Sequence, residues 1–230
     1  MDNVIAIDGP AASGKSTIAN QVAQRLGIYY INTGNMYRGA TLLALENNIT
    51  SETPSEKELE KLASDNQITY EKDKSGKLVL TINGKEADLD KIRSPEVTLY
   101  VSVISKSNAI RNWLVREQRK MTSLGYILME GRDIGTNVFP NARYKFFLTA
   151  SPEIRAIRRL SQGGETPKNA TVASVARDIA LRDELDSKRA IAPLRKADDA
   201  ILLDSSHLSI DEVLNKIMTL LRENYDLTKK

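Results

Sequence analysis

The sequence predicts a three-layer α/β fold, in which a five-stranded parallel sheet is flanked by helices. Short β-branched, apolar runs of the kind found in buried parallel strands alternate with helical patterns along most of the 230 residues. The first apolar run leads through a glycine-rich turn directly into a helix. Near the middle of the chain, two segments alternate in polarity instead, which indicates a small antiparallel β insertion in an otherwise single α/β domain.

The N-terminal stretch has the pattern of a strand, a turn and a helix. Residues 4–7 are apolar and largely β-branched, as in a strand buried on both faces. A helix is expected over residues 15–26, because its apolar residues recur on one stripe and Gly27 ends it. Residues 29–31 predict a second strand, and residues 36–46 predict a second helix.

The middle of the chain has a different pattern. A polar helix is expected over residues 55–62. Residues 67–71 and 77–82 alternate in polarity like the two strands of a hairpin, with a polar, glycine-containing turn between them. Two further helices are expected between residues 95 and 121, with a break near residues 105–108.

The C-terminal half returns to alternating strands and helices. The remaining strands of the parallel sheet are expected at residues 126–129, 145–148 and 200–203. One helix begins at Pro152, a glycine-rich loop follows at residues 162–167, and a second helix covers residues 172–187. The last helix opens with a capping box formed by Ser209 and Glu212.

The composition excludes several classes of protein. The chain has no cysteine, which excludes disulfides, thiolate zinc sites and cysteine nucleophiles, and its single histidine, His207, lies in a polar turn. The net charge of +3 is too small to indicate DNA wrapping or binding to an anionic membrane. Because the sequence contains neither a signal peptide nor an apolar run long enough to cross a bilayer, we expect a cytoplasmic protein with no membrane partner.

The glycine-rich turn matches the phosphate-binding pattern G-x-x-x-x-G-K-[ST], the P-loop. Gly9 and Gly14 allow a tight turn that aims backbone N–H groups at an anion, and the following helix points its positive end at the same place. We expect Lys15 to reach the β- and γ-phosphates of a nucleoside triphosphate and the Ser16 hydroxyl to ligate Mg²⁺. The predicted phosphate-binding residues are Gly9, Pro10, Ala11, Ala12, Ser13, Gly14, Lys15, Ser16 and Thr17.

Further patterns favour a kinase over other P-loop proteins. The chain lacks the Asn-Lys-x-Asp sequence with which a switch GTPase reads its base. After the predicted strand that ends at residue 129, Arg132 stands where a motor ATPase would have a water-activating carboxylate. Arg38 and Arg132 both follow predicted strands, at the edge where open parallel sheets bind ligands. Such bidentate cations suit a transfer between two anions, whose repulsion must be cancelled.

These motifs together resemble those of one family, the bacterial cytidylate (CMP) kinases of the nucleoside monophosphate kinase group. The resemblance runs from Ile5 to the final helix, and its motifs lie at residues 9–17, 32–38, 130–136 and 182–194. The last two motifs are specific to this family, whereas many unrelated nucleotide-binding proteins share the first. The resemblance implies a monomeric enzyme that transfers a phosphoryl group from ATP, with Mg²⁺, to CMP or dCMP.

The resemblance also implies a role for each residue that matches a family position. Thr33 and Arg38 would contact CMP, with Arg38 on its phosphate. Ser102 and Arg111 would read the cytosine edge and the phosphate side, and Asp186 the ribose hydroxyls. The implied CMP-binding residues are Thr33, Arg38, Ser102, Arg111, Arg132, Asp133, Arg182, Asp186 and Arg189. The implied catalytic residues are Lys15, Arg132, Arg155 and Arg159.

The same resemblance divides the single domain, residues 1–230, into three parts. The core would comprise about residues 1–35, 95–150 and 190–230. A nucleoside monophosphate (NMP)-binding region with the β insertion would cover about residues 36–94. A helical lid would cover about residues 155–189, and its glycine-rich loop would close over the site.

A few positions depart from the family pattern. Asn32 and Glu130 stand where the family usually has aspartate, close to the implied Mg²⁺, and Asn35 stands where alanine is common. An amide at position 32 removes one charge near the metal, while Glu130 keeps a charge on a longer arm. A purely structural role for Asn32 is that it caps a turn.

Other functions stay open from the residues alone. A kinase of the same fold could act on UMP, a sugar or a shikimate-like alcohol, and an alcohol acceptor would call for a base such as Asp133. A regulatory nucleotide-binding module would not need the whole set of arginines. Nucleic-acid binding is disfavoured, because aromatic residues make up 5% of the chain and are not interleaved with a basic patch.

Overall fold

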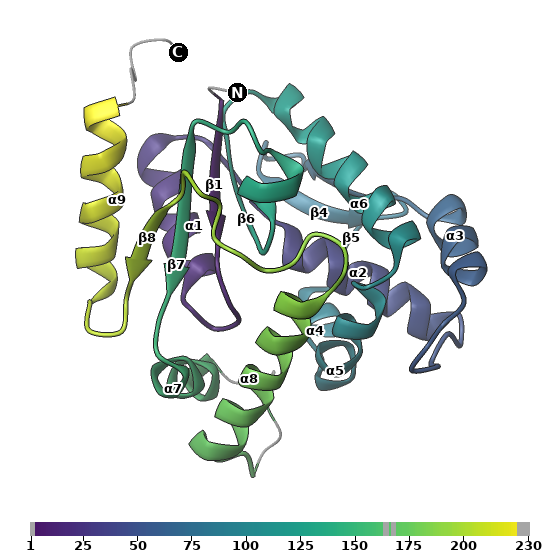
Figure 1. The fold of residues 1–230 in the computed structure, drawn as a ribbon. Coiled ribbons are helices and arrows are strands. Elements are labelled where there is room, and N and C mark those ends of the chain that lie inside the picture. Colours follow the sequence, from purple (N-terminus) through teal and green to yellow (C-terminus); the bar gives the residue numbers. More distant parts are fainter. Residues whose placement is uncertain (1–2, 163–165, 167–168, 225–230) are drawn as a thin grey trace.

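A five-stranded parallel sheet forms the centre of the computed structural model, which describes residues 3–162, 166 and 169–224 (Figure 1). Its strands are β1 (Val4–Asp8), β2 (Tyr29–Asn32), β6 (Ile127–Gly131), β7 (Tyr144–Thr149) and β8 (Ile201–Asp204). They lie in the order β2-β6-β1-β7-β8, and every neighbouring pair is parallel, which confirms the predicted sheet. The connection that follows β1 leads to β2 on one side of the sheet, and the connection that follows β6 leads to β7 on the other side, so a crevice opens at the carboxyl ends of β1 and β6.

Helices cover both faces of this sheet, since the strands alternate their side chains between two apolar layers. Ile5 and Ile7 of β1 belong to one layer, and Val4 and Ala6 belong to the other. The principal helices of these layers are α1 (Lys15–Leu26) and α9 (Ile210–Asn224) in the first layer and α6 (Asn108–Lys120) in the second. Every residue of β1 is buried, as expected for a strand covered on both sides.

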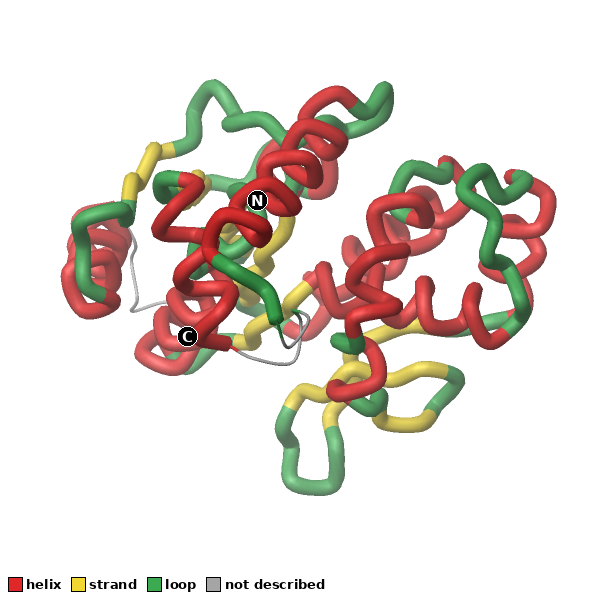
Figure 2. The backbone as a smooth tube through the Cα atoms, turned by 90° about the horizontal axis from the view of Figure 1, so that it is seen from below, coloured by secondary structure: helices red, strands yellow, loops and turns green. Residues whose placement is uncertain are grey.

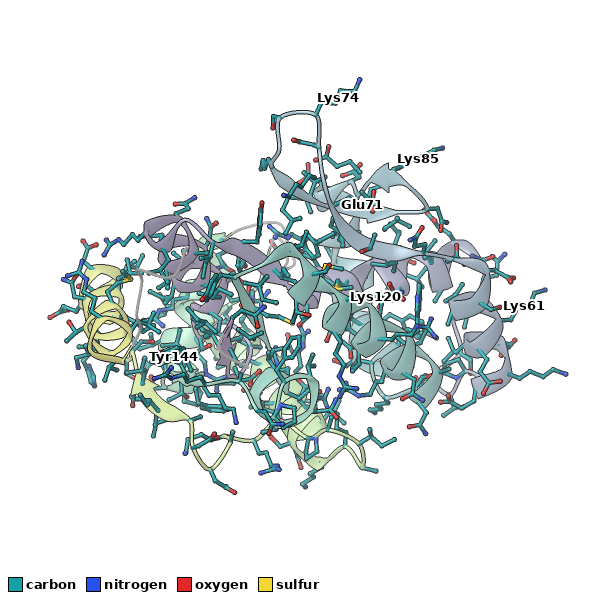
Figure 3. All side chains as sticks on the ribbon, turned by 90° about the horizontal axis from the view of Figure 1, so that it is seen from above. Lys61, Glu71, Lys74, Lys85, Lys120 and Tyr144 are labelled. Carbon is teal, nitrogen blue, oxygen red and sulfur yellow. The ribbon has the colours of Figure 1, made fainter. Side chains whose placement is uncertain are left out.

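A second region lies beside the main sheet and combines helices with a small antiparallel sheet (Figure 2). Its helices are α2 (Thr33–Glu46), α3 (Glu56–Asp65), α4 (Leu89–Ile92) and α5 (Pro95–Ile104), and its strands are β3 (Ile68–Lys72), β4 (Leu78–Ile82) and β5 (Lys85–Glu86). The predicted hairpin is confirmed, with Ile68 opposite Ile82. Lys74 and Lys85 project from this sheet, away from the helices (Figure 3). Trp113 of α6 is buried among the apolar residues of this region, as predicted.

Two helices pack against the P-loop below the main sheet: α7 (Pro152–Gln162) and α8 (Val172–Lys188). Ala156 of α7 and Val175 and Ile179 of α8 form an apolar cluster with Ala11 of the P-loop. Gly163 and Gly164, in the loop that we expect to close over the site, lie outside the described residues.

Several element boundaries differ from the predictions for local reasons. Helix α2 begins at Thr33 rather than residue 36, because the Asn32 side chain caps it by accepting the Asn35 N–H at 3.1 Å. The two-residue strand β5, the 3₁₀-helix η1 (Met121–Leu124) and the π-helix η2 (Ile134–Val138) are too short for periodicity to reveal. The capping box is confirmed, since the Ser209 hydroxyl accepts the Glu212 N–H at 3.2 Å. None of the helices in the described part of the chain is long and apolar enough to cross a membrane.

Gly9 gives the first testable prediction. Its φ angle is +153°, and a Cβ atom added there would lie 2.0 Å from the carbonyl oxygen of Leu148 in β7. We expect Gly9→Ala to lower the free energy of unfolding by about 3 kcal/mol, because the backbone of β7 has to move. Urea unfolding measures the loss. Gly76→Ala is the control, since Gly76 also has a positive φ but nothing within 4 Å, and its loss should be about 1 kcal/mol. Equal losses would contradict the steric account.

Candidate active site

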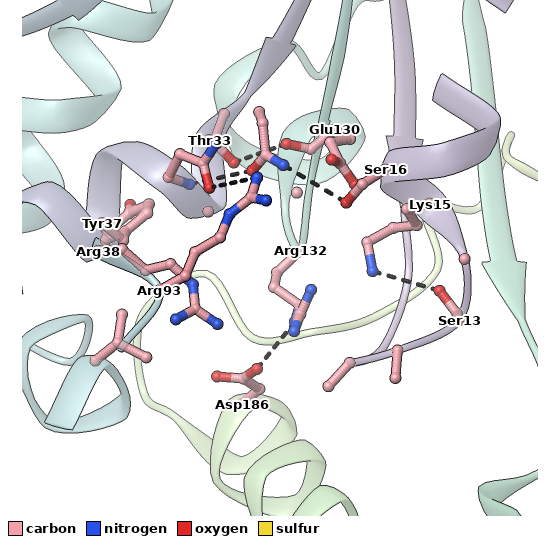
Figure 4. A pocket seen from close by; sticks show the side chains of 18 of the residues that line it. Ser13, Lys15, Ser16, Thr33, Tyr37, Arg38, Arg93, Glu130, Arg132 and Asp186 are labelled. Carbon is pink, nitrogen blue, oxygen red and sulfur yellow. Dashed lines mark hydrogen bonds and ion pairs between the residues drawn. The ribbon is translucent and has the colours of Figure 1, made fainter. Parts of the chain in front are cut away.

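A cavity of about 1080 Å³ opens at the carboxyl ends of β1, β2 and β6 (Figure 4). This is the crevice in which open parallel sheets bind their ligands. The P-loop contributes Ala11, Ala12, Ser13, Gly14, Lys15, Ser16 and Thr17 to its lining. The other predicted residues that line it are Thr33, Arg38, Arg111, Arg132, Asp133, Arg159, Arg182, Asp186 and Arg189.

The P-loop bends around the N-terminus of α1, as predicted. Gly9, Ala12 and Gly14 have φ angles of 153°, 57° and 92°, so three residues of the loop adopt positive φ angles. This backbone shape forms an anion-binding concavity of N–H groups. The first turn of α1 carries no acidic side chain, so the positive end of the helix is left to act on a ligand.

Lys15 is buried in the wall of the cavity, with 6% of its surface exposed. Its Nζ atom donates to the Pro10 carbonyl at 2.6 Å and to Ser13 Oγ at 3.4 Å. Burial and the positive charge of Arg132 lower the pKa of Lys15 to about 7, although Glu130 and other nearby carboxylates act in the opposite direction. A ligand that brings negative charge would restore the charged form of this side chain.

Arginines from separate segments converge on the same cavity. They are Arg38 on α2, Arg132 after β6, Arg159 on α7 and Arg182 on α8. Burial lowers the pKa of Arg182, and the charges of the other three arginines lower it further. Burial and neighbouring arginines also lower the pKa values of Arg38 and Arg159. Like charges held close together in a desolvated crevice create a field that favours bound anions.

Two buried aspartates hold the arginines on the side of the cavity away from the P-loop. Asp133 pairs with Arg111 at 2.5 Å and with Arg189 at 3.4 Å. Asp186 pairs with Arg132 at 3.0 Å (Figure 4). Burial alone would raise the pKa of Asp186, but the surrounding arginines, Arg132 first among them, outweigh it and lower the pKa. Asp186 therefore stays ionised, and both aspartates position the cations through these ion pairs.

Two buried hydrogen-bond donors in this wall indicate that a polar ligand completes the site. The Nε atoms of Arg111 and Arg182 are buried and have no hydrogen-bond partner within the described chain. Buried polar atoms in folded proteins are normally satisfied, so these atoms fit a site that a nucleotide completes. Arg38 is already oriented, because its Nη1 atom donates to Thr98 Oγ1 at 2.6 Å.

A chain of hydrogen bonds links the P-loop to the end of β6. The Tyr30 hydroxyl donates to the Glu130 carboxylate. Asn32 Nδ2 lies 3.2 Å from the Tyr30 hydroxyl and 3.5 Å from Ser16 Oγ. Burial and the Glu130 charge raise the pKa of Tyr30, so its hydroxyl keeps the proton. Asn32 therefore both caps α2 and links Ser16 to the side chains around Glu130.

Asp8 at the end of β1 supports the turn that follows β6. Its carboxylate accepts the N–H groups of Ile134 at 2.8 Å and Gly135 at 2.7 Å. Burial raises the pKa of Asp8 to about 6, and these two hydrogen bonds limit the rise. The turn that carries Arg132 and Asp133 is thus fixed from the central strand.

Three predicted residues lie behind or beside the cavity wall. Gly9 and Pro10 are not among the described lining residues, and Gly9 lies against β7. Ser102 is also outside the lining. Helix α5 reaches the cavity through Val101 instead, and Ser105, at the C-terminal end of that helix, also lines it. The single-residue offset follows from helix geometry, since neighbouring positions point about 100° apart.

Arg155 also lies outside the lining of the cavity. Its Nε atom donates to the Ala150 carbonyl at 3.0 Å, and its Nη1 atom donates to the Ala11 carbonyl at 3.2 Å. The same guanidinium forms an ion pair with Asp183. Arg155 therefore holds the P-loop from behind, while Arg159, one turn later on α7, lines the cavity.

Tyr37 and Arg93 also line the cavity, and neither is among the predicted site residues. Tyr37 lies under Arg111, whose guanidinium carbon is 5.6 Å from the centroid of the ring. Arg93 Nη2 lies 3.5 Å from Asn35 Oδ1. Tyr37 directly precedes Arg38 in a motif, which is a usable signal, whereas nothing in the sequence around Arg93 indicates that it reaches the cavity.

The fold and the site together define a phosphotransferase of the P-loop class. A phosphate-binding loop at the end of β1 shares one cavity with arginines from α2, α7, α8 and the end of β6. This arrangement suits the transfer of a phosphoryl group, in which positioning and charge neutralisation supply the catalysis.

Comparisons with known proteins identify the family. A model of the cytidylate kinase family matches residues 5–223. The chain is 43% identical over 216 residues to a cytidylate kinase of Bacillus cereus, with 94% of each chain covered, and 44% identical over 214 residues to one of Bacillus thuringiensis, with 93% of each covered. The fold is similar to that of an uncharacterised protein from Eubacterium ventriosum, with a TM-score of 0.50 at 14% identity over 97% of this chain and 100% of that one. The chain belongs to the cytidylate kinase family.

Lys15 gives a prediction about stability. Its pKa in the folded protein, about 7, lies below the ordinary value of 10.5, so the buried charge opposes folding at and below pH 7, and this opposition fades as the pH rises toward 10.5. Lys15→Met should therefore stabilise the ligand-free protein by about 2 kcal/mol at pH 6 and by much less at pH 10. Urea unfolding at the two pH values measures the difference.

The control for this prediction is Lys61→Met, since Lys61 extends from α3 into solvent (Figure 3). The control variant should unfold like the unmodified protein at both pH values. Destabilisation by Lys15→Met, or a gain that does not depend on pH, would contradict the proposed cost of burying this charge.

Proposed function

We propose that this protein transfers the γ-phosphoryl group of Mg²⁺-bound ATP to CMP or dCMP, with ADP and CDP or dCDP as the products. One observation supports the proposal above all others. Between the P-loop and Asp133, one cavity gathers Lys15 and several arginines that are buried close enough to lower one another's pKa values. A site of this kind suits two facing polyanions better than one.

The proposed reaction needs little chemistry from the protein itself. An oxygen of the acceptor phosphate forms a bond to the γ-phosphorus, the bond from that phosphorus to the β–γ bridging oxygen breaks, and the electron pair leaves with ADP. Because the attacking oxygen is already ionised, no general base is required. The protein aligns the two phosphates and cancels their repulsion. Lys15 and the P-loop N–H groups hold the donor phosphates, and Arg132 and Arg159 face the transferring group.

The acceptor nucleotide would occupy the side of the cavity formed by α2, α6 and α8. Arg38, oriented by Thr98, would hold the CMP phosphate. Arg111 and Asp133, paired with each other, would read the cytosine edge, and Asp186 would accept hydrogen bonds from the ribose hydroxyls. The remaining residues proposed for CMP are Thr33, Ser102, Arg132, Arg182 and Arg189. Ser102 and Arg155 would act from behind the wall that the ligand touches.

The state of Asp133 disfavours an alcohol acceptor. A kinase that acts on a hydroxyl group benefits from a carboxylate that can take up the proton. Asp133 is the base considered for that task, but it is engaged by Arg111 at 2.5 Å and by Arg189 at 3.4 Å. Both of its carboxylate oxygens are already paired with guanidinium groups, so neither is free to take up the proton of a hydroxyl group, and a phosphate acceptor fits this site better.

The residues beside the P-loop fit Mg²⁺. The Ser16 hydroxyl and the Glu130 carboxylate line the same cavity and would hold the ion, directly or through water. The described residues contain no cluster of three or more carboxylate, histidine or cysteine side chains. Mg²⁺ in phosphotransferases is typically bound by one or two protein groups together with substrate phosphates and water, so a sparse site is suitable. When bound, the ion would neutralise charge on the donor phosphates.

Three further features belong to the proposal. We propose that the chain acts as a monomer and in the cytoplasm. We also propose that about residues 36–94 serve as the NMP-binding region, about residues 155–189 as the lid, and about residues 1–35, 95–150 and 190–230 as the core. These parts correspond to the region around the antiparallel sheet and to the helices α7 and α8.

An acceptor screen tests this function directly. ADP release, coupled to an absorbance change, is measured with ATP and Mg²⁺ over CMP, dCMP, UMP, AMP, a sugar and shikimate. CMP and dCMP should give kcat/KM values at least about 100-fold above the other acceptors, because the paired arginines and aspartates of the wall would present donors and acceptors that match only one base. A flat profile, or one led by UMP or an alcohol, would contradict the acceptor assignment.

Lys15→Met provides the control for this screen. Turnover with CMP should fall by about 1,000-fold or more, because a principal donor of charge to the transferring group is lost. Its circular dichroism spectrum should match that of the unmodified protein. Near-normal turnover in this variant would show that the measured activity does not arise from the P-loop site.

A further inference from the structure

One ion pair joins the two helices α7 and α8 directly behind the P-loop. Arg155 on α7 and Asp183 on α8 form this pair, and their side chains are only 8% and 16% exposed. The pair does not line the cavity among the described residues, so it is not positioned to touch either nucleotide.

The pair binds both backbone polar groups of one P-loop residue. The Ala11 N–H donates to Asp183 Oδ1 at 3.1 Å, and the Ala11 carbonyl accepts from Arg155 Nη1 at 3.2 Å. Arg155 Nε also donates to the Ala150 carbonyl, just after β7, at 3.0 Å. The loop is therefore tied at one point to two helices and to the end of a central strand.

Apolar packing at the same point strengthens this connection. Ala11 is 2% exposed and is buried with Ala156, Val175 and Ile179 of the two helices. The next residue, Ala12, has a φ of 57°, a conformation that a residue with a side chain adopts only when its surroundings impose it. The shape of the P-loop thus depends on contacts from α7 and α8.

We propose that Asp183 is a positioning residue for the donor site: through Ala11 and Arg155, its carboxylate sets the P-loop in the conformation that receives the phosphates of ATP. The inference rests on the proposed function only in that the P-loop must bind ATP. Asp183 acts on the loop backbone and on Arg155, not on a reacting atom.

The charge of Asp183 also acts on the cations that face the donor. It raises the pKa of Lys15 and that of Arg159, against the effect of burial on both. A single carboxylate therefore holds the loop and favours the charged forms of two side chains at the donor phosphates. These effects concern the ATP half of the cavity, since Arg38 and Asp133 lie in the other half.

The test is calorimetric titration of Asp183→Asn with ADP and, separately, with CMP. Asparagine keeps the size of the side chain and one acceptor oxygen but removes the charge. The dissociation constant for ADP should rise about tenfold, the loss expected for a charge-assisted hydrogen bond, while that for CMP should stay within about twofold. Hydrogen exchange should become faster in the segment 9–17 and stay unchanged around Arg189.

Two further variants keep the test decisive. Glu184→Gln is the matched control, because Glu184 is the next residue of α8 but pairs with Lys188 on the exposed face at 2.6 Å; its ADP affinity should be unchanged. If Asp183→Asn does not fold because Arg155 is left buried without its counter-ion, the double variant Asp183→Asn/Arg155→Met removes both charges and should show the same tenfold loss.

The outcomes separate the two proposals. ADP affinity within twofold of the unmodified protein, or equal losses for ADP and CMP, would overturn the role of Asp183. Failure of the unmodified protein to phosphorylate CMP would refute the proposed acceptor but leave the ADP titration valid. Loss of ADP binding by Glu184→Gln would also overturn the proposal, because α8 would then act through its general stability.

Discussion

Buried positive charge at the carboxyl ends of β1 and β6 is the constraint on which the rest of the structure depends. Lys15 and Arg182 are desolvated, Arg132 repels both, and the pKa values of both are lowered. Such charge opposes folding until anions enter, so the protein gives up some stability for a site prepared in advance. In phosphoryl transfer between two nucleotides the barrier comes largely from bringing anions together, and this prepared field is what lowers it.

The carboxylates of the site are arranged so that they position this charge without cancelling it. Asp133 and Asp186 pair with arginines on the side of the cavity away from the P-loop, and Asp183 pairs with Arg155 behind the P-loop. The Asp8 carboxylate accepts hydrogen bonds from the backbone of the turn after β6. Each carboxylate therefore orients a cation or a loop from the edge of the cavity, and the centre is left positive for the phosphates.

The sequence predicts the parts of this structure that depend on nearby residues. The buried strands, the P-loop and the cap at Ser209 follow from patterns within a few positions, and the structure confirms them. The place of Arg155 could not be predicted, because its partner Asp183 lies 28 residues away and a charged side chain looks the same in sequence whether it faces a ligand or a backbone. Ser102 misses the lining by one helical position, and nothing in the sequence indicates that Arg93 reaches the cavity, because contacts between distant segments decide which side chains do so.

We propose that one cavity holds two nucleotides, with their phosphates facing across a field of positive charge. A molecule that joins adenosine and cytidine through a pentaphosphate chain tests it most directly, by calorimetric titration. One molecule should bind per chain, at least about 100-fold more tightly than ATP or CMP, and it should exclude both, because the two halves of the site are occupied at once. An affinity equal to that of ATP, with CMP still able to bind, would contradict the account.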